Sequence, residues 1–564
     1  MKKFRYILPC FLLGLTLSSC NGFLDKEPWD SIDTSKSFQA AEDAIAAVNG
    51  AYQPLQWPKL YNMRMWTLDI VAGNSIVGAG GGTDGIETTD MANFITTTDN
   101  AGVLDVWRGP SPGILRCNFV IKNVPGMNID QSLKNRCLGE AKFLRAHYYF
   151  ILVRLFGGVP LLTEPQTSED DLKPFRASKE EIYKLIEDDL KEAINLLPDK
   201  SSYSASDLGR ASKGAARGML ARVMLYRLGT DAECSNTWQD LYDITNSIIT
   251  SGSYQLVPNY ATLFEEITDG DYRRESLFEY TGKNGSQNAG MVLSWFFERN
   301  RSAAGGWGFN QPTQDLVDAF DITDPRLSCT VYGIGYNNGI LYGIPSNFPD
   351  RAGQMMTNYY SRKMATYDGE SGQDALLTGT TKAIFVIRYA DILLMHAEAA
   401  YYLQREDEAR QKVNEVRRRA RESSYCQGFM IGSPREFVYP DITPNIPDLD
   451  SSVTGQALLE AIWNERRLEL GMENIRTYDL IRTGRLLDRL SKVKDQYRTG
   501  GAGPVNTNNN ADMEIRIPGI GNNIQQYCLK VNVPGIGGGE RYLPLLAIPN
   551  TEITYWNIEP NHNN

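Results

Sequence analysis

Few side chains in this 564-residue chain are placed to perform acid–base or nucleophilic catalysis. There are three histidines: His147 and His396 lie in segments with helical periodicity, and His562 lies in the tail. The chain contains no H-E-x-x-H motif and no P-loop. The sequence therefore predicts no catalytic residue and no cofactor. A carboxylate pair of the kind that hydrolyses glycosides stays open, because the distance between two acids cannot be read from a sequence.

Acidic side chains and arginines share the segments with helical periodicity. The acids are Asp391, Glu398, Glu465 and Glu469, and the arginine runs are Arg417–Arg419 and Arg466–Arg467. Arginine runs can bind phosphate, but the formal net charge of −11 argues against a nucleic-acid surface. We therefore expect these acids and arginines to form ion pairs between helices.

Flat aromatic side chains gather in two stretches rich in Gly, Asn, Thr and Ser, residues 57–111 and 252–384. Sugar rings present C–H faces that pack on aromatic rings, while Asp and Asn side chains bind the hydroxyl groups. This mixture favours a binding site for sugars on long loops. The candidate ligand-binding residues are Trp66, Asp69, Asn74, Trp295, Trp307, Tyr336, Tyr359 and Tyr360. The alternative for each aromatic residue is that it packs the interior of its own loop.

Segments with helical spacing must hold these loops in place. Between Gly139 and Leu162, two apolar stripes recur at steps of three and four residues. A helix that is apolar around most of its circumference must be buried in an array of other helices. Gly157 and Gly158 predict its end, and Pro160 prevents it from resuming.

Further helical segments flank the two loop stretches. They are residues 37–52, 112–123, 132–156, 178–197, 209–228, 238–251, 387–400, 406–421 and 456–485. Pairs of such segments about 35–45 residues apart suggest tetratricopeptide-like helical hairpins. The predicted fold class is mostly α: a tetratricopeptide-like array of helical hairpins, with long irregular loop excursions and few short strands. The helical scaffold is expected at about 36–56, 112–251 and 385–485.

The N-terminus has the pattern of an export signal. A basic start precedes a short apolar run from Ile7 to Leu17, and small residues then lead to Cys20. The pattern predicts a signal peptide over residues 1–19 and a lipid anchor on Cys20, followed by a lead segment to residue 35. An ordinary signal peptide with an incidental cysteine is the alternative. No later stretch reaches ~18 uninterrupted apolar residues, the length of a membrane-spanning helix.

The other cysteines of the exported chain are scattered. They are Cys117, Cys137, Cys234, Cys329, Cys426 and Cys528. Their spacing fits no metal site, so none is predicted. A core of this size needs no covalent crosslinks, so we expect buried free thiols, with some disulfide pairing left open.

Five segments carry a resemblance to a known family. The segment from Glu140 to Leu161 reads E-A-K-F-L-R-A-H-Y-Y-F-I-L-V-R-L-F-G-G-V-P-L and resembles the signature helix of the SusD/RagB family. The other segments are G-W-G…P-T-Q-D-L-V-D-A-F…D-P-R, I-R-Y-A-D-I-L-L-M-H-A-E-A-A, I-W-N-E-R-R-L-E-L-G-M-E-N-I-R-T-Y-D-L-I-R and Y-L-P-L-L-A-I-P-N-T-E-I. The last residues of the chain depart from the family's usual tail. The resemblance covers nearly the whole exported chain.

Members of the SusD/RagB family are surface nutrient-binding lipoproteins, and several implications follow from the resemblance. It implies a single domain over residues 36–564, anchored in the cell outer membrane through Cys20 and facing outward. It also implies an oligosaccharide ligand and a SusC-like TonB-dependent transporter that docks on the helical face. The ligand site would lie on loops outside the helices, but site residues vary among members, so none of the candidates carries over by motif.

Two other functions stay open at this stage. One is the binding of peptides or another non-glycan nutrient in the same transport role. The other is a lipid-anchored glycoside hydrolase, which would need two carboxylates beside an aromatic cleft.

Overall fold

The structure is a computed structural model. It describes residues 38–61, 64–78, 85–165, 175–264, 271–281, 308–333, 357, 359–363, 382–425, 443–492, 495–497, 511–513, 520–535 and 537–561. The predicted signal peptide, Cys20, Trp295, Trp307, Tyr336, Cys426 and His562 lie outside the described residues.

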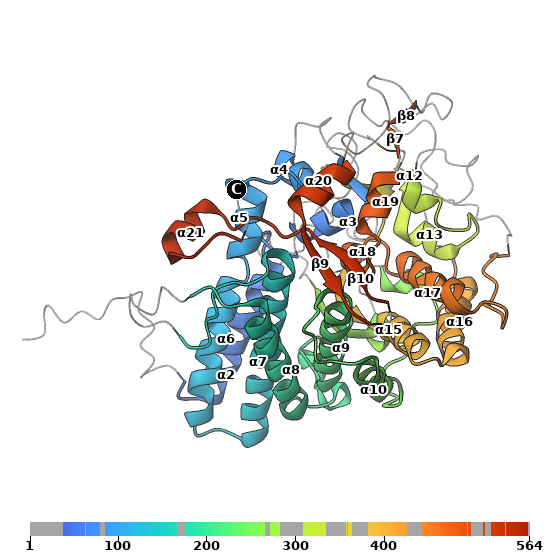
Figure 1. The fold of residues 1–564 in the computed structure, drawn as a ribbon. Helices are drawn as coiled ribbons and strands as arrows, with labels where there is room; N and C mark the ends of the chain where they lie inside the picture. The colour runs from blue at the N-terminus through green and yellow to red at the C-terminus, as the bar shows by residue number, and fades with distance from the viewer. Residues whose placement is uncertain are drawn as a thin grey trace, which may run out of the picture.

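Helical hairpins form the lower part of the molecule in Figure 1. They comprise α2 (Ala41–Tyr52), α6 (Ser111–Asn123), α7 (Gln131–Phe156), α8 (Lys179–Leu196), α9 (Lys213–Thr230), α10 (Trp238–Ile249), α15 (Tyr389–Tyr402), α16 (Glu406–Glu422) and α17 (Gly455–Glu469). Each helix in this order packs against the next. This arrangement confirms the predicted mostly α, tetratricopeptide-like array.

Helix α7 lies at the centre of the array, as its two apolar stripes predict. Nearly every residue from Gly139 to Phe156 is buried against α2, α6, α8 and α9. Gly113 of α6 allows close approach, because a Cβ atom there would lie 2.2 Å from the ring of Tyr148. The helix ends at Gly157, whose φ of +74° suits glycine.

The stretch 57–111 is more helical than its composition predicts. It contains α3 (Thr67–Val71), α4 (Ile86–Ala92) and α5 (Ala101–Arg108) in addition to 3-10 turns. Helices of this length are too short to show a repeat of apolar residues, which explains why the sequence pattern missed them.

The single helix predicted over residues 456–485 is also wrong. After α17 ends at Glu469, Met472 and Asn474 adopt positive φ angles of 61° and 63°. The chain resumes as α18 (Arg476–Arg482) and α19 (Leu486–Lys492). Left-handed residues cannot continue a helix, and their turn directs Glu473 toward Arg388 and Lys363.

Short antiparallel strand pairs join segments far apart in sequence. β1 (Ser75–Gly78) pairs with β3 (Phe309–Pro312), β2 (Ser276–Thr281) with β6 (Ala383–Arg388), and β4 (Val331–Gly333) with β5 (Tyr359–Ser361). β7 (Asp495–Tyr497) pairs with β8 (Ala511–Met513), and β9 (Leu529–Val533) with β10 (Gly539–Leu543). The remaining helices are α12 (Gln314–Val317), α13 (Pro325–Thr330), α20 (Ile520–Tyr527) and α21 (Asn550–Trp556). The strands are few and short, as predicted.

One hydrophobic core runs through the described chain from Ala44 in α2 to Ile558 near the C-terminus. The described cysteines are all free thiols: Cys117, Cys137, Cys234, Cys329 and Cys528. Burial raises the pKa of the Cys528 thiol to about 12 and that of Cys137 to about 11. The prediction of buried free thiols is confirmed for four of these residues, whereas Cys234 is a free thiol that is only half-buried. In the described part of the chain, no helix is both long and apolar enough to cross a bilayer.

Candidate ligand-binding site

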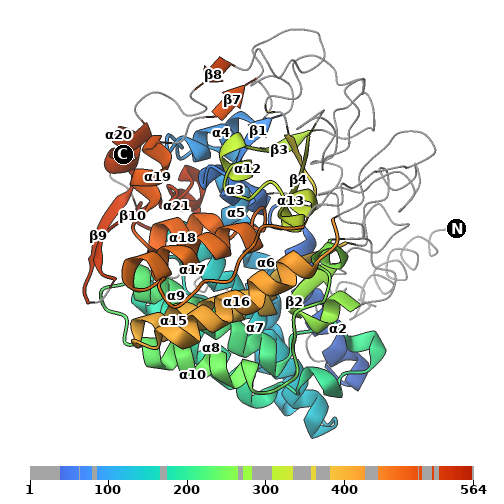
Figure 2. The same cartoon turned by 90° about the vertical axis from the view of Figure 1, so that its right-hand side faces the viewer.

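The segments that contain the aromatic candidates begin and end on short strands. Trp295 and Trp307 lie between β2 and β3, and Tyr336 lies between β4 and β5. We call the strands β1, β3, β4 and β5 the strand platform, because β3 pairs with β1 and also contacts β5. Figure 2 shows β1, β3 and β4 together at the end of the molecule opposite α8 and α10.

Hydrogen bonds join the two loop stretches in the strand platform. Ser75 Oγ donates to Asn310 Oδ1 at 2.5 Å, and the Thr313 amide donates to the carbonyl of Asn74 at 3.0 Å. The Thr357 amide donates to Gln311 Oε1 at 3.2 Å. Residues from both stretches therefore form one unit, although Ser75 and Asn310 are 235 positions apart in the sequence.

The described candidates lie inside this unit. Asp69, Tyr359 and Tyr360 are each 1% exposed, and Asn74 is fully buried. Trp66 ends the 3-10 turn η2 (Arg64–Trp66), directly before the helix that contains Asp69. The structure thus brings Asp69, Asn74, Tyr359 and Tyr360 together as buried support for the loops. In this conformation, neither tyrosine presents a ring face to solvent.

Asp69 is a buried acid that forms no ion pair with a described residue, although the charge of Lys363 acts on it. The Asn474 amide donates to its Oδ1 at 3.2 Å. In the orientation that satisfies its neighbours, the Asn474 side chain also donates to Asp69 Oδ2 at 3.1 Å. Burial outweighs these bonds and raises the pKa of Asp69 to about 7. A proton therefore neutralises this carboxyl group below neutral pH.

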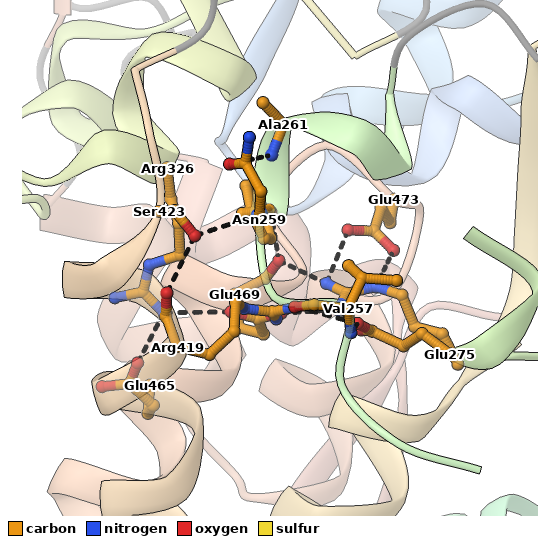
Figure 3. Close-up of polar contacts among 12 residues, drawn as sticks. Val257, Asn259, Ala261, Glu275, Arg326, Arg419, Ser423, Glu465, Glu469 and Glu473 are labelled. Atoms are coloured by element: carbon orange, nitrogen blue, oxygen red, sulfur yellow. Dashed lines mark hydrogen bonds and ion pairs between the residues drawn. The ribbon is translucent and has the colours of Figure 1, made fainter. Parts of the chain in front are cut away.

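A buried set of charges holds the second loop stretch on the helices (Figure 3). Glu469 of α17 accepts from Arg388 at 2.5 Å and from Arg326 at 3.1 Å, and it also binds Arg419 of α16. Glu275, which precedes β2, accepts from Arg388 at 2.7 Å and from Arg419 at 2.8 Å. The three arginines hold the pKa of Glu469 well below its usual range despite burial.

Further ion pairs extend this set to the end of β5. Glu473 binds Arg388 at 2.9 Å and Lys363 at 2.7 Å. The members are Arg326, Lys363, Arg388, Arg417, Arg419, Glu275, Asp324, Glu465, Glu469 and Glu473, five cations and five anions. We call it the balanced ion network. It connects the ends of β2, β5 and β6 to α13, α16 and α17.

The four acids considered for catalysis all form ion pairs with arginines. Glu465 and Glu469 belong to the balanced ion network. Asp391 lies between Arg222 and Arg466, at 2.5 and 2.8 Å, and Glu398 binds both Nη atoms of Arg482, at 2.6 and 2.8 Å. All four acids are buried. The predicted ion pairs between helices are therefore confirmed.

The two described histidines lie within the packed helical array. His147 Nε2 lies 3.1 Å from the Tyr61 hydroxyl, and burial lowers the pKa of His147 to about 3. His396 lies 2.9 Å from the Thr245 hydroxyl and 3.1 Å from Glu408. Both are part of the packing between helices.

A cavity of about 770 Å³ lies away from the strand platform, between α7, α8, β9 and the C-terminal segment. Two of its basic side chains already have partners. Arg176 donates to the carbonyls of Gly158 and Pro560, at 2.8 and 3.2 Å, and Lys179 binds Asp231 at 3.1 Å. Because these groups bond to the protein itself, the loops on the strand platform are the better candidate site.

The sequence pattern missed one group of side chains near the platform. Arg476, Arg485 and Arg489 follow the predicted arginine run, and their motif gives no sign that they differ from Arg466. The structure places them beside Arg467, which donates to Asn74 Oδ1 at 3.3 Å. The only sequence signal that could have identified them is that basic residues outnumber acidic residues in this part of the chain.

Comparison with known families gives two matches along this chain. A model described as "SusD family" matches residues 274–529, and one described as "Starch-binding associating with outer membrane" matches residues 22–225. A relative described as SusD-like protein P38 from Formosa agariphila is 28% identical over 521 residues, which cover 87% of this chain and 94% of that protein.

Solved structures share the fold. A SusD superfamily protein from Bacteroides vulgatus superposes with a TM-score of 0.70 at 20% identity, covering 93% of this chain and 99% of that one. Surface glycan-binding protein A from Bacteroides thetaiotaomicron, solved with laminarihexaose, gives a TM-score of 0.65 at 20% identity, covering 92% and 99%.

Proposed function

Because the chain belongs to the SusD family, we propose that it is a surface protein that binds an oligosaccharide through the loops of its strand platform. One observation carries the proposal. The segments with Trp295, Trp307 and Tyr336 begin and end at strands, and the balanced ion network fixes the ends of β2 and β5 on the helices. Rigidly anchored loops with flat aromatic side chains suit sugar binding.

The comparisons support a glycan as the ligand class. A protein of the same fold is described as a laminarin-binding SusD-like protein, and it aligns with 93% of this chain at 24% identity and a TM-score of 0.66. The complex with laminarihexaose is a second example of a glycan bound by this fold. Peptides or another non-glycan nutrient are the alternative ligands, and a glycoside hydrolase is the alternative activity.

We further propose a role in transport at the cell outer membrane. Residues 1–19 would be removed as a signal peptide, Cys20 would carry the lipid anchor, and residues 36–564 would form one outward-facing domain. This domain would pass its ligand to a SusC-like TonB-dependent transporter docked on the helical face. The family description that mentions the outer membrane supports this placement. Weak affinity would suffice, because an anchored partner raises the effective ligand concentration.

The binding experiment uses the soluble form that lacks residues 1–20. Calorimetry against a panel of glycans and oligopeptides, with a parallel assay for released reducing ends, separates the three functions. We expect saturable binding of one glycan class without hydrolysis. Release of reducing ends would establish a hydrolase, and binding of peptides alone would overturn the glycan assignment.

Two variants locate the binding site. Trp307→Ala is expected to weaken glycan binding more than tenfold, because stacked aromatic residues dominate such contacts. Tyr555→Ala is the control, since Tyr555 is a 56% exposed aromatic residue in α21, outside the strand platform. Equal loss in both variants would contradict the proposed location.

The transport role has its own test. In cells that contain the cognate transporter, the full chain is expected to fractionate with the outer membrane and to co-purify with the transporter. Cys20→Ala should release it from the membrane. Membrane retention of the variant would contradict lipid anchoring at this residue.

A further inference from the structure

Four arginines form a second charged group near the strand platform. They are Arg467 at the end of α17, Arg476 in α18, Arg485 before α19 and Arg489 within α19, and we call them the arginine cluster. The charges of Arg467 and Arg485 both act on Arg476 and help to lower its pKa. Arg467 and Arg489 share one carboxylate, Asp315.

The arginine cluster has too few acids of its own. Asp315 is the only carboxylate in an ion pair with it among the described residues, and it lies 2.5 Å from Arg467 Nη2. Asp479 and Glu398 lie within electrostatic range of Arg485. They are already bound, however: Asp479 to Arg466 and Arg482, and Glu398 to Arg482. Four positive charges therefore face one paired negative charge.

Three of these arginines have buried N–H groups without hydrogen-bond acceptors among the described residues. These groups are Nε and Nη1 of Arg476, Nη2 of Arg485, and Nη2 of Arg489, which meets Asp315 as an ion pair. Arg476 is only 8% exposed. Burial, together with the charges of Arg467 and Arg485, lowers the pKa of Arg476 well below its usual value. A buried guanidinium group without an acceptor is costly, so its persistence points to an acceptor from outside the protein.

The position of the arginine cluster connects it to the proposed ligand site. Arg467 donates to Asn74 Oδ1 at 3.3 Å, next to β1, and Asp315 belongs to α12, which follows β3. Helix α12 also contacts β7. In Figures 1 and 2, α12, α18 and α19 lie on the side of the helical array from which β7 and β8 project. The cluster thus lies against the support of the loops that we propose to hold the glycan.

We propose that the arginine cluster binds an oxyanion, the carboxylate or sulfate ester of an acidic oligosaccharide held by the loops. This inference rests on the proposed function and names its ligand class. The planar guanidinium group presents paired N–H donors that match the two oxygens of a carboxylate or sulfate group. An anion there would supply both the missing acceptors and the missing charge.

The first test compares acidic and neutral oligosaccharides of equal length by calorimetry on the soluble form. The acidic glycan is expected to bind at least tenfold more tightly than its neutral counterpart, because each charge-assisted hydrogen bond contributes about a factor of ten. Arg485→Met and Arg489→Met should remove that preference. Arg418→Met is the control, because Arg418 is exposed on α16 and outside the cluster. Equal binding of both glycans, or an unchanged preference in the variants, would overturn the inference and leave glycan binding intact.

The second test does not depend on glycan binding. Thermal unfolding is measured in sodium sulfate, sodium glucuronate and sodium chloride at matched ionic strength. The wild type is expected to show a saturable rise in Tm with sulfate or glucuronate beyond that in chloride. Arg476→Met and Arg485→Met should abolish this excess, whereas Arg418→Met should keep it. The same excess in all four proteins would overturn the anion site, even if no glycan in the panel bound.

Discussion

The balanced ion network and the arginine cluster use the same residue types, yet they differ in charge balance. In the network, five cations meet five anions, and Glu469 alone binds three arginines. In the cluster, four arginines meet one paired carboxylate, Asp315. The network is therefore balanced in charge within the protein and serves to position strands, although Nε of Arg417 and Nε of Arg419 have no hydrogen-bond partner among the described residues. The cluster is incomplete, which suits the binding of an external anion.

Burial alone does not distinguish the two groups. Arg388 is 1% exposed and Arg476 is 8% exposed, so both guanidinium groups have lost most of their hydration. Arg388 has carboxylate oxygens of Glu275, Glu469 and Glu473 within 2.9 Å. Arg476 has no ion pair with any described residue. The partners of a buried arginine, and not its degree of burial, therefore indicate whether it has a structural role.

The largest effect is expected when the balanced ion network is broken. Glu469→Gln should lower the free energy of unfolding by about 3–5 kcal/mol, because three buried arginines lose their shared charge. Urea denaturation measures the change. Glu460→Gln on the exposed side of α17 is the control and should leave stability unchanged. A loss below about 1 kcal/mol for Glu469→Gln would show that the network does not hold the strands.

The buried acid Asp189 in the scaffold, which binds both Lys142 and Arg145, tests whether charge balance stabilises the protein elsewhere. Arg145 of α7 donates to both carboxylate oxygens of Asp189 in α8, at 2.7 and 2.9 Å. Asp189→Asn should lower the free energy of unfolding by about 3 kcal/mol, because it leaves Arg145 buried with only amide and carbonyl acceptors. Asp188→Asn, at the exposed neighbouring position, is the control. Equal stability of the two variants would contradict the importance of charge pairing in this core.

Asp69 differs from these acids, because it is buried but forms no ion pair with a described residue. Its pKa is raised from 3.8 to about 7, so the folded protein keeps a proton that the unfolded chain releases above pH 4. The stability contributed by that proton is present below pH 4 and is lost as the pH rises through 7.

Asp69→Asn has no proton to release, so its stability relative to the wild type should improve by roughly 1–3 kcal/mol between pH 4 and pH 8. Chemical denaturation at a series of pH values measures this difference. Asp99→Asn, at an exposed position in the same stretch, should follow the wild type at every pH. A constant difference between Asp69→Asn and the wild type would mean that Asp69 ionises normally.

The sequence predicts the scaffold better than the site because the two depend on different distances along the chain. The apolar stripes of α7 repeat within 24 residues, so its burial could be predicted from local pattern alone. The strand platform depends on β1 pairing with β3, more than 230 residues away, and no local pattern encodes that contact. Local pattern therefore did not show that Tyr359 and Tyr360 are each only 1% exposed.

The adjacent residues Arg466 and Arg467 also show that local sequence does not predict long-range partners. Arg466 binds Asp391 of α15, as expected for an ion pair between helices. Arg467 points about 100° around the same helix and contacts Asp315 and Asn74 instead. Their shared motif cannot distinguish them, because the partners come from segments 75, 152 and 393 positions away.

The most direct test of the difference between the arginine cluster and the balanced ion network is the same substitution in each, Arg476→Met and Arg388→Met. The free energy of unfolding is measured in chloride buffer free of sulfate and carboxylate ions. Arg388→Met should lose about 3–5 kcal/mol, because it leaves buried acids unpaired. Arg476→Met should equal or exceed the wild type, because it removes a buried charge that has no partner. A comparable loss for Arg476→Met would contradict the account, since it would show that Arg476 already has its anion within the protein.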